Sequence, residues 1–205
     1  MSTCTARVLL CLSEKGLEYE LVPVQMSKGA HKQQPYLSLN PFGQIPAFED
    51  GDVSLFESRA ICKYLALKHK DIGTDLLRSS SFAEATIVDL WMEVEAHQFN
   101  GPISAFIRQI FLNPMFGRAP DEKVIETETE KLGKILDVYE ERLSKSKYLA
   151  GDYYTMVDMN HIPYLVYFMK TPYATVVTSR PHVSAWWKNV LSRPATIKVS
   201  SGMTL

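Results

Sequence analysis

Hydroxyl and acidic side chains stand where two helices are predicted to begin. Ser2 precedes a short amphipathic pattern that ends near Gly16, and Glu57-Ser58 precede a second helical pattern that runs to Lys68. The free N–H groups and the dipole of a helix N-terminus favour an anion, and serine is also a preferred helix cap. These residues therefore allow either simple capping or, at Glu57-Ser58, binding of an amino-carboxylate group.

A second set of candidate residues lies in predicted loops. His31-Lys32 on their own are typical of a solvated loop. Gln44-Ile45-Pro46 is more informative, because a proline at the start of a strand lacks a donor and permits a cis bond that turns the preceding backbone outward. The backbone of Ile45 could then pair with an extended peptide.

The elements that must position these residues change in character near residue 70. Before it, Tyr19–Val24 is predicted to be a strand, with Pro23 indicating an edge or an end. Residues 45–49 and 52–56 flank Asp50-Gly51 and predict an antiparallel hairpin. One predicted helix precedes these strands and ends near Gly16, and another follows the hairpin and runs to Lys68. Together they predict a small α/β layer.

From about residue 81 the apolar pattern is helical. Thr155 and Asp158 are spaced as in a capping box at a helix start, and Gly101-Pro102 predicts a bend. We expect helices over residues 82–112, 121–146, 156–170 and 181–191. The fold class is therefore α+β with two domains: residues 1–70, a linker over 71–80, and an all-helical domain over 81–205.

Composition excludes several classes of protein. The chain has 205 residues, of which 46% are apolar, and a net charge of −1, which is typical of a globular protein that needs no disulfides. Three cysteines, an odd number, suggest reduced thiols and a cytoplasmic location. The histidines lack ligand spacing, so we expect no metal. Neutral charge balance argues against a nucleic-acid partner, and no run approaches the roughly 20 apolar residues of a membrane helix.

Taken together, the motifs resemble those of a plant-type, phi-class glutathione transferase, over essentially the whole chain. The matching stretches are Ser2 with Arg7 five residues later, His31-Lys32, Asn40-Pro41-Phe42-Gly43-Gln44-Ile45-Pro46, Glu57-Ser58-Arg59-Ala60-Ile61, and Thr155 with Asp158. The resemblance implies a thioredoxin-like N-terminal domain, an all-α C-terminal domain and a homodimer. It also implies conjugation of glutathione, as co-substrate, to hydrophobic electrophiles in detoxification, with no bound prosthetic group.

The resemblance also implies roles for individual residues. Ser2 would donate a hydrogen bond to the glutathione sulfur. The glutathione-binding residues would be His31, Lys32 and Gln44 at the glycine end, Ile45 beside Pro46 at the cysteinyl unit, and Glu57 and Ser58 at the γ-glutamyl end.

Two further assignments carry an alternative based on ordinary packing. An electrophile pocket between the domains would use Met26, Phe106, Ile110 and Tyr167, each of which could equally be a core residue. Phe42 resembles an aromatic side chain that such enzymes insert into the partner subunit. Its competing interpretation is a buried aromatic of the chain's own core.

One departure from the family pattern concerns the first strand. Family members have a central strand ahead of the serine, whereas this chain starts with Met1-Ser2, so we expect that strand to be missing and Tyr19–Val24 to lose its neighbour.

Rival functions remain open at this stage. The main alternative is a non-catalytic carrier of hydrophobic ligands, and an interaction module on the same fold is a third. Cys4 at a helix start suggests thiol–disulfide exchange. Glutathione-dependent hydroperoxide reduction would use the same thiolate as conjugation.

Overall fold

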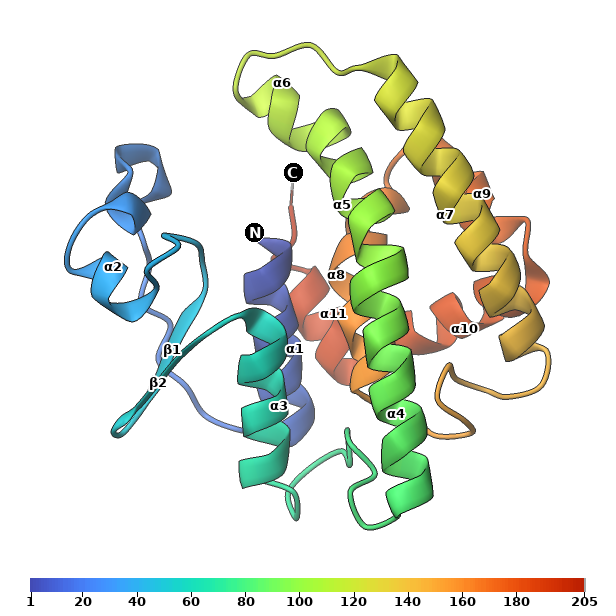
Figure 1. Cartoon of the computed structure of the whole chain (residues 1–205), viewed down its shortest axis with the longest axis horizontal. Coiled ribbons are helices and arrows are strands. Elements are labelled where there is room, and N and C mark those ends of the chain that lie inside the picture. The colour runs from blue at the N-terminus through green and yellow to red at the C-terminus, as the bar shows by residue number, and fades with distance from the viewer. Residues whose placement is uncertain (205) are drawn as a thin grey trace. The chain divides into compact units, whose positions relative to one another are not determined.

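The computed structural model describes residues 1–204, which divide into two compact units, Met1–Asp75 and the part of the chain from Leu76 onward (Figure 1). The first unit combines helices with a small sheet, and the second is helical. The expected α+β fold class with two domains is therefore confirmed. The chain passes from the first unit to the second between Asp75 and Leu76.

Short elements make up the first unit. They are α1 (Thr3–Lys15), the 3₁₀ turns η1 (Met26–Lys28) and η2 (Ala30–Lys32), α2 (Tyr36–Leu39), β1 (Ala47–Asp50), β2 (Val53–Phe56) and α3 (Ser58–Lys68). The helix α1 begins and ends as predicted. Ser2 is its N-cap, and Gly16, at φ 64°, adopts the left-handed conformation that closes its C-terminus.

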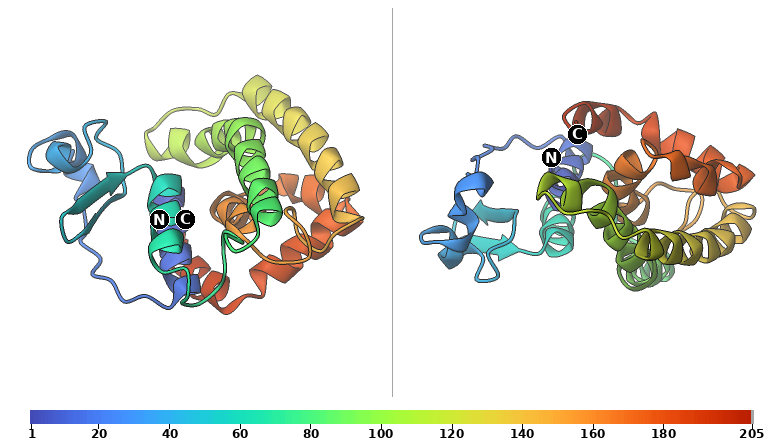
Figure 2. Two further views of the ribbon diagram at one scale, coloured as in Figure 1. Left: turned by 60° about the horizontal axis from the view of Figure 1, so that its bottom comes forward. Right: turned by 90° about the horizontal axis from the view of Figure 1, so that it is seen from above.

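Helices α1 and α3 pack side by side and run in the same direction (Figures 1 and 2). Arg7 contacts Ser58, and one turn later Cys11 contacts Cys62, so the two helices advance together. Their shared face is fully buried and apolar; it includes Ala6, Leu10, Cys11, Ile61 and Cys62. Burial of this face removes apolar surface from water, and it places both helix N-termini at the same end.

The sheet contains two strands. β1 and β2 pair antiparallel with Ala47 opposite Phe56 and Asp50 opposite Val53, which confirms the predicted hairpin. Gly51 occupies its turn at φ 59°, a conformation that glycine adopts readily.

The predicted strand Tyr19–Val24 is wrong. The segment is extended and irregular, and no strand in residues 1–204 pairs with it. Leu21 and Val22 are 59% and 70% exposed. A strand depends on hydrogen bonds to a neighbouring strand, and within residues 1–204 this segment has none.

A continuous helical run opens the second unit. It consists of α4 (Phe82–Val94), the π-helical turn η3 (Glu95–Phe99), α5 (Asn100–Ile107), a second π-helical turn η4 (Arg108–Leu112) and α6 (Asn113–Met115). The predicted long helix is thus confirmed, with a π turn directly ahead of Pro102. A proline inside a helix lacks an N–H and crowds the preceding turn, and a local widening of the helix accommodates it.

The remaining elements follow in chain order. They are α7 (Glu122–Leu143), α8 (Met156–Phe168), the 3₁₀ turn η5 (Pro172–Ala174), α9 (Thr175–Thr178), α10 (Pro181–Leu191) and α11 (Pro194–Ser200). The helix over residues 181–191 was the last one expected, so α11 was not predicted. Proline is favoured at the first helical position, and here it starts a new helix. Within residues 1–204, no helix combines the length and the apolar character needed to cross a bilayer.

The predicted capping box at the start of α8 is confirmed. Asp158 is fully buried and accepts hydrogen bonds from the backbone N–H of Thr155 (3.0 Å) and from the Trp186 ring (2.9 Å). Burial raises the pKa of Asp158 to about 6, although these hydrogen bonds act in the opposite direction. The carboxylate thus joins the start of α8 to α10.

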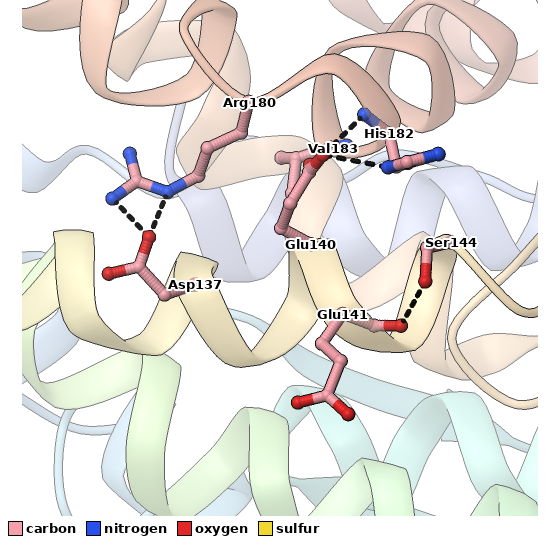
Figure 3. Close-up of polar contacts among 7 residues, drawn as sticks. All are labelled: Asp137, Glu140, Glu141, Ser144, Arg180, His182 and Val183. Atoms are coloured by element: carbon pink, nitrogen blue, oxygen red, sulfur yellow. Dashed lines mark hydrogen bonds and ion pairs between the residues drawn. The ribbon is translucent and has the colours of Figure 1, made fainter.

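A second carboxylate joins α7 to α10 (Figure 3). Glu140 accepts hydrogen bonds from the backbone N–H groups of His182 (3.0 Å) and Val183 (2.9 Å) and from the His182 ring (2.7 Å). Burial alone would raise the pKa of Glu140, but these hydrogen bonds hold it below its ordinary value. One turn earlier, Arg180 pairs with Asp137 at 2.7 Å. Helix N-termini leave N–H groups unpaired, and Glu140 satisfies two of them.

We predict that Glu140→Gln lowers the free energy of unfolding by about 1–2 kcal/mol at pH 7, because charge-assisted hydrogen bonds to a helix N-terminus are lost. The pKa of Glu140 is lower in the folded than in the unfolded protein, so its contribution is present above the unfolded value. The difference between wild type and variant should shrink as pH falls through the lowered pKa. Urea unfolding at several pH values measures it.

Glu141→Gln is the matched control, because Glu141 neighbours Glu140 and pairs only at the surface, with Lys145 at 2.9 Å. Such pairs contribute about 0.3–0.5 kcal/mol. An equal loss of stability in both variants would contradict the role given to Glu140.

Candidate functional site

The loop that carries Gln44 and Ile45 is held by two side chains that bind one carbonyl. The Tyr36 hydroxyl and the Asn40 amide each donate to the backbone oxygen of Gln44 at 2.7 Å. The Asn40 side-chain oxygen also accepts from the backbone N–H of Phe42 at 3.0 Å. Asn40 is only 2% exposed, whereas Gln44 is exposed. The loop is therefore fixed from inside, and the Gln44 side chain is free to face outward.

Sequence reasoning did not assign a role to Tyr36 or Asn40. Asn40 was noted only as the first residue of a matching motif. A buried amide must find hydrogen-bond partners, and a short polar side chain just ahead of Pro41 and Gly43 is the available signal for a loop anchor. Tyr36 gives no comparable local signal.

His31-Lys32 contact this loop at Gly43. Its φ is 55°, and a Cβ at this position would lie 2.6 Å from the backbone oxygen of His31. The Lys32 ammonium donates to the backbone oxygen of Phe42 at 2.9 Å. The absence of a side chain at Gly43 therefore allows the two segments that carry His31, Lys32 and Gln44 to meet.

The N-termini of α1 and α3 form the second half of the site. The Ser2 hydroxyl oxygen accepts from the Thr5 N–H at 3.4 Å, which confirms that Ser2 caps α1 and leaves its proton available to donate. Ser58, the first residue of α3, is 4% exposed and accepts from the Arg7 guanidinium at 2.7 Å. Glu57 is exposed and has a positive φ of 67°, a strained conformation that is frequent at functional sites.

A groove of about 710 Å³ in the first unit runs along α1 from Thr5 to Leu12 and past residues 17–24. Ile45 and Pro46 line it, and the bond between them is cis. Its lining does not include Ser2, Glu57 or Ser58, so the groove is distinct from the two helix N-termini. These N-termini carry partial positive charge, and the end of the first unit at which they lie suits an anionic group.

The residues expected to line an electrophile pocket are spread over both units. Met26, in η1, is 44% exposed. In the second unit, Phe106 is fully buried against Phe168 and Tyr173, with ring centroids 4.9 and 5.2 Å apart. These contacts are those of a core residue, which favours the packing alternative for Phe106.

The two other pocket candidates also lie in the second unit. Ile110 belongs to η4 and is half-buried, and Tyr167 is 6% exposed with its ring 5.8 Å from that of Phe111. Ile110 therefore keeps some exposed surface, whereas Tyr167 is packed against a neighbouring ring.

Phe42 is 66% exposed and its ring lies 5.9 Å from that of Phe56. It does not belong to the buried core of the chain, so that alternative is wrong. An exposed ring of this size on a rigid loop is a candidate for contact with another protein surface.

Cys4, Cys11 and Cys62 are free thiols. Over residues 1–204, no three side chains of His, Cys, Asp or Glu gather in a way that could hold a metal ion.

Comparison with known proteins gives consistent results for both units. Residues 1–67 match the family model described as "Glutathione S-transferase, N-terminal domain", and residues 103–194 match "Glutathione S-transferase, C-terminal domain". The chain is 57% identical over 205 residues to "Glutathione S-transferase F13" of Arabidopsis thaliana, covering 100% of this chain and 94% of that relative.

Solved structures agree with the sequence matches. Glutathione transferase F7 from Populus trichocarpa is 54% identical, with a TM-score of 0.98 and coverage of 100% of this chain and 96% of that one. Glutathione S-transferase I from mais, in complex with an atrazine glutathione conjugate, is 45% identical, with a TM-score of 0.93 and coverage of 99% and 94%.

We predict that Gly43→Ala destabilises the loop of residues 40–46, because the added Cβ would lie 2.6 Å from the His31 carbonyl oxygen and the residue would keep a positive φ. Faster amide hydrogen exchange in this loop and a lower midpoint of urea unfolding are the expected results.

Gly51→Ala is the control that separates backbone strain from steric collision of the added Cβ. Gly51 has a similar φ of 59°, and its added Cβ would meet nothing within 4 Å. It should therefore cost only the backbone strain, about 1 kcal/mol. A loss at Gly43 no larger than that at Gly51 would show that the close approach of His31 is unimportant.

Proposed function

The chain belongs to the glutathione S-transferase family, and on that basis we propose that it conjugates the thiolate of glutathione to hydrophobic electrophiles. One relative of known structure was solved with a glutathione conjugate of atrazine. The single observation within this chain that carries the proposal is the arrangement of the first unit. The parallel N-termini of α1 and α3 and the anchored loop of residues 40–46 together offer the groups that a short anionic peptide requires.

Each end of glutathione is assigned to groups of matching chemistry. His31, Lys32 and Gln44 bind the glycine carboxylate, because they offer N–H donors and one cation. The backbone of Ile45, ahead of Pro46, pairs with the cysteinyl unit as strands pair. At the other end, the exposed Glu57 carboxylate accepts from the γ-glutamyl ammonium and the Ser58 hydroxyl donates to its carboxylate.

Ser2 stabilises the thiolate and does not act as a nucleophile. A thiol of pKa about 8.5 is only ~3% thiolate at pH 7, whereas a thiol whose pKa is two units lower is about three-quarters thiolate. Two units correspond to about 2.7 kcal/mol. One charge-assisted hydrogen bond from Ser2, at roughly 1.5–3 kcal/mol, together with the α1 N-terminus at about 0.3–1, accounts for this difference.

The thiolate would attack an electrophile held by apolar side chains. Met26 is exposed and Ile110 is half-buried, so both offer surface to a ligand, whereas Tyr167 and Phe106 are buried and would support them. Detoxification of xenobiotic electrophiles and reduction of hydroperoxides both use this thiolate. The carrier alternative has less support, because the relatives reported above are transferases by name.

We further propose a homodimer in the cytoplasm without a bound cofactor. The exposed Phe42 ring would insert into the partner subunit, since an aromatic side chain on a fixed loop makes an effective interface anchor. The free cysteines are consistent with a reducing compartment.

We expect Ser2→Ala to lower kcat for conjugation to a simple aryl halide by about 5- to 15-fold at pH 7, because the α1 N-terminus alone would keep only about 5–15% of the thiol ionised. The KM for glutathione should change little, and the activity of the variant should recover at higher pH. Steady-state rates at several pH values test this.

Ser81→Ala is the matched control, since Ser81 caps α4 through the same contact, with its hydroxyl accepting from the Glu84 N–H at 3.4 Å. It should lose cap stability and keep its activity. Equal turnover of wild type and Ser2→Ala would refute the role of Ser2, and folded wild-type protein without conjugation would refute the function.

For the dimer, we expect Phe42→Ala to weaken self-association by about 30-fold or more, because interface anchors contribute 2 kcal/mol or more. Sedimentation velocity over a concentration series measures this. Phe116→Ala removes a ring of similar exposure, 70%, from the second unit and should leave the dimer intact. A wild-type chain that sediments as a monomer at all concentrations would contradict the assembly.

A further inference from the structure

Arg7 is a buried cation whose contacts lead to the proposed ligand site. It is fully buried on α1, and its Nη1 donates to the Ser58 hydroxyl at 2.7 Å and to the Cys4 sulfur at 3.8 Å. Burial of a guanidinium is costly unless it is well hydrogen-bonded. The sequence offered Arg7 only as a spacing marker five residues after Ser2.

The hydrogen bond from Arg7 determines what the Ser58 hydroxyl can do. A serine hydroxyl has one proton to donate and lone pairs to accept. Because the oxygen of Ser58 accepts from a cation, its proton remains available for another partner. A hydroxyl that accepts from a charged donor is polarised and becomes a stronger donor itself.

The position of Ser58 determines which kind of group its hydroxyl can donate to. Ser58 begins α3, whose N-terminus lies at the same end as that of α1 because the two helices run parallel. Two helix dipoles and one buried guanidinium therefore favour negative charge at this point. The adjacent Glu57 is exposed, so its carboxylate is available to a cationic group of the same ligand.

We propose that Arg7 is a positioning residue that acts through Ser58, by orienting and polarising its hydroxyl toward the α-carboxylate of the γ-glutamyl end of glutathione. The proposal rests on the function proposed above. Arg7 itself touches no substrate in this scheme. Its contribution is affinity for that carboxylate and discrimination against ligands that lack it.

The test is a double-mutant cycle in the full chain, with Arg7→Gln, Ser58→Ala and the double variant. Arg7→Gln should raise the KM for glutathione about tenfold, as expected for the loss of a charge-assisted hydrogen bond, with kcat changed less. In the Ser58→Ala background the same change should have less than about a twofold effect. An equal rise in both backgrounds would overturn the proposal.

A second substrate tests the chemistry of the ligand directly. γ-Aminobutyryl-cysteinyl-glycine is glutathione with its γ-glutamyl α-carboxylate replaced by hydrogen. Wild type should prefer glutathione in kcat/KM, and both Arg7→Gln and Ser58→Ala should lose most of that preference. Preference retained by Ser58→Ala would overturn the proposal even if Arg7→Gln does not fold.

Lys15→Met is the matched control for loss of a buried cation. Lys15 also lies on α1, is 1% exposed, and donates to the backbone oxygen of Thr74 at 3.0 Å, two turns away from Arg7. It should lower the melting temperature without changing the preference for the α-carboxylate. If it changed that preference as Arg7→Gln does, the effect would be general loosening of α1 and the proposal would fail.

These outcomes differ from failure of the proposed function. Folded wild-type protein that neither binds nor consumes glutathione would refute the function. Active wild-type protein whose Arg7→Gln variant keeps its KM and its substrate preference would refute only the role of Arg7.

Discussion

The parallel packing of α1 against α3 is the interaction on which the first unit depends. Its apolar face, with Ala6, Leu10 and Ile61 at zero exposure, fixes the register of the two helices. That register brings Arg7 to Ser58 and aligns two helix N-termini. In an antiparallel arrangement the dipoles would oppose each other, and the two positive helix ends would not lie at the same end of the unit. A non-directional hydrophobic contact thus determines the electrostatics of the site.

The anchored loop complements this face by a different means. The two side chains that hold it, from Tyr36 and Asn40, converge on one backbone oxygen, that of Gln44. Hydrogen bonds to a backbone carbonyl fix the course of the chain without using the side chain of that residue. Gln44 is consequently available to a ligand although its position is rigid, and Gly43 permits the close approach of His31. The same two hydrogen bonds therefore make the loop rigid and leave the Gln44 side chain accessible.

Carboxylates join helices of the second unit, and the pKa of one is raised while that of the other is lowered. Asp158 is fully buried, and burial raises its pKa to about 6 in spite of its hydrogen bonds. Glu140 lies nearer the surface, and its hydrogen bonds outweigh burial and lower its pKa. Both accept from N–H groups at a helix start, so similar contacts act differently on stability as pH changes. The balance between desolvation and hydrogen bonding decides the sign.

What the sequence by itself determined are the features encoded within a few residues. Ser2 and Gly16 bound α1, Asp50-Gly51 predict the hairpin, and Thr155 with Asp158 predict the start of α8, because caps and tight turns depend on local hydrogen bonds and backbone conformations. Motifs of this kind also identified the family. Their spacing could not show that the loop of residues 40–46 is anchored by Tyr36.

Only the tertiary structure decided the features that need a distant partner. Tyr19–Val24 has a strand-like sequence and forms no strand, because a strand exists through hydrogen bonds to a neighbour. The sequence left Phe106 open as a pocket or a core residue, and its contacts with Phe168 and Tyr173 are those of a core residue. Arg7 acquires its contact with Ser58, 51 residues away, when α1 and α3 pack together. Local chemistry is determined by the sequence of a segment, whereas pairing, burial and convergence depend on which other segments the fold brings beside it.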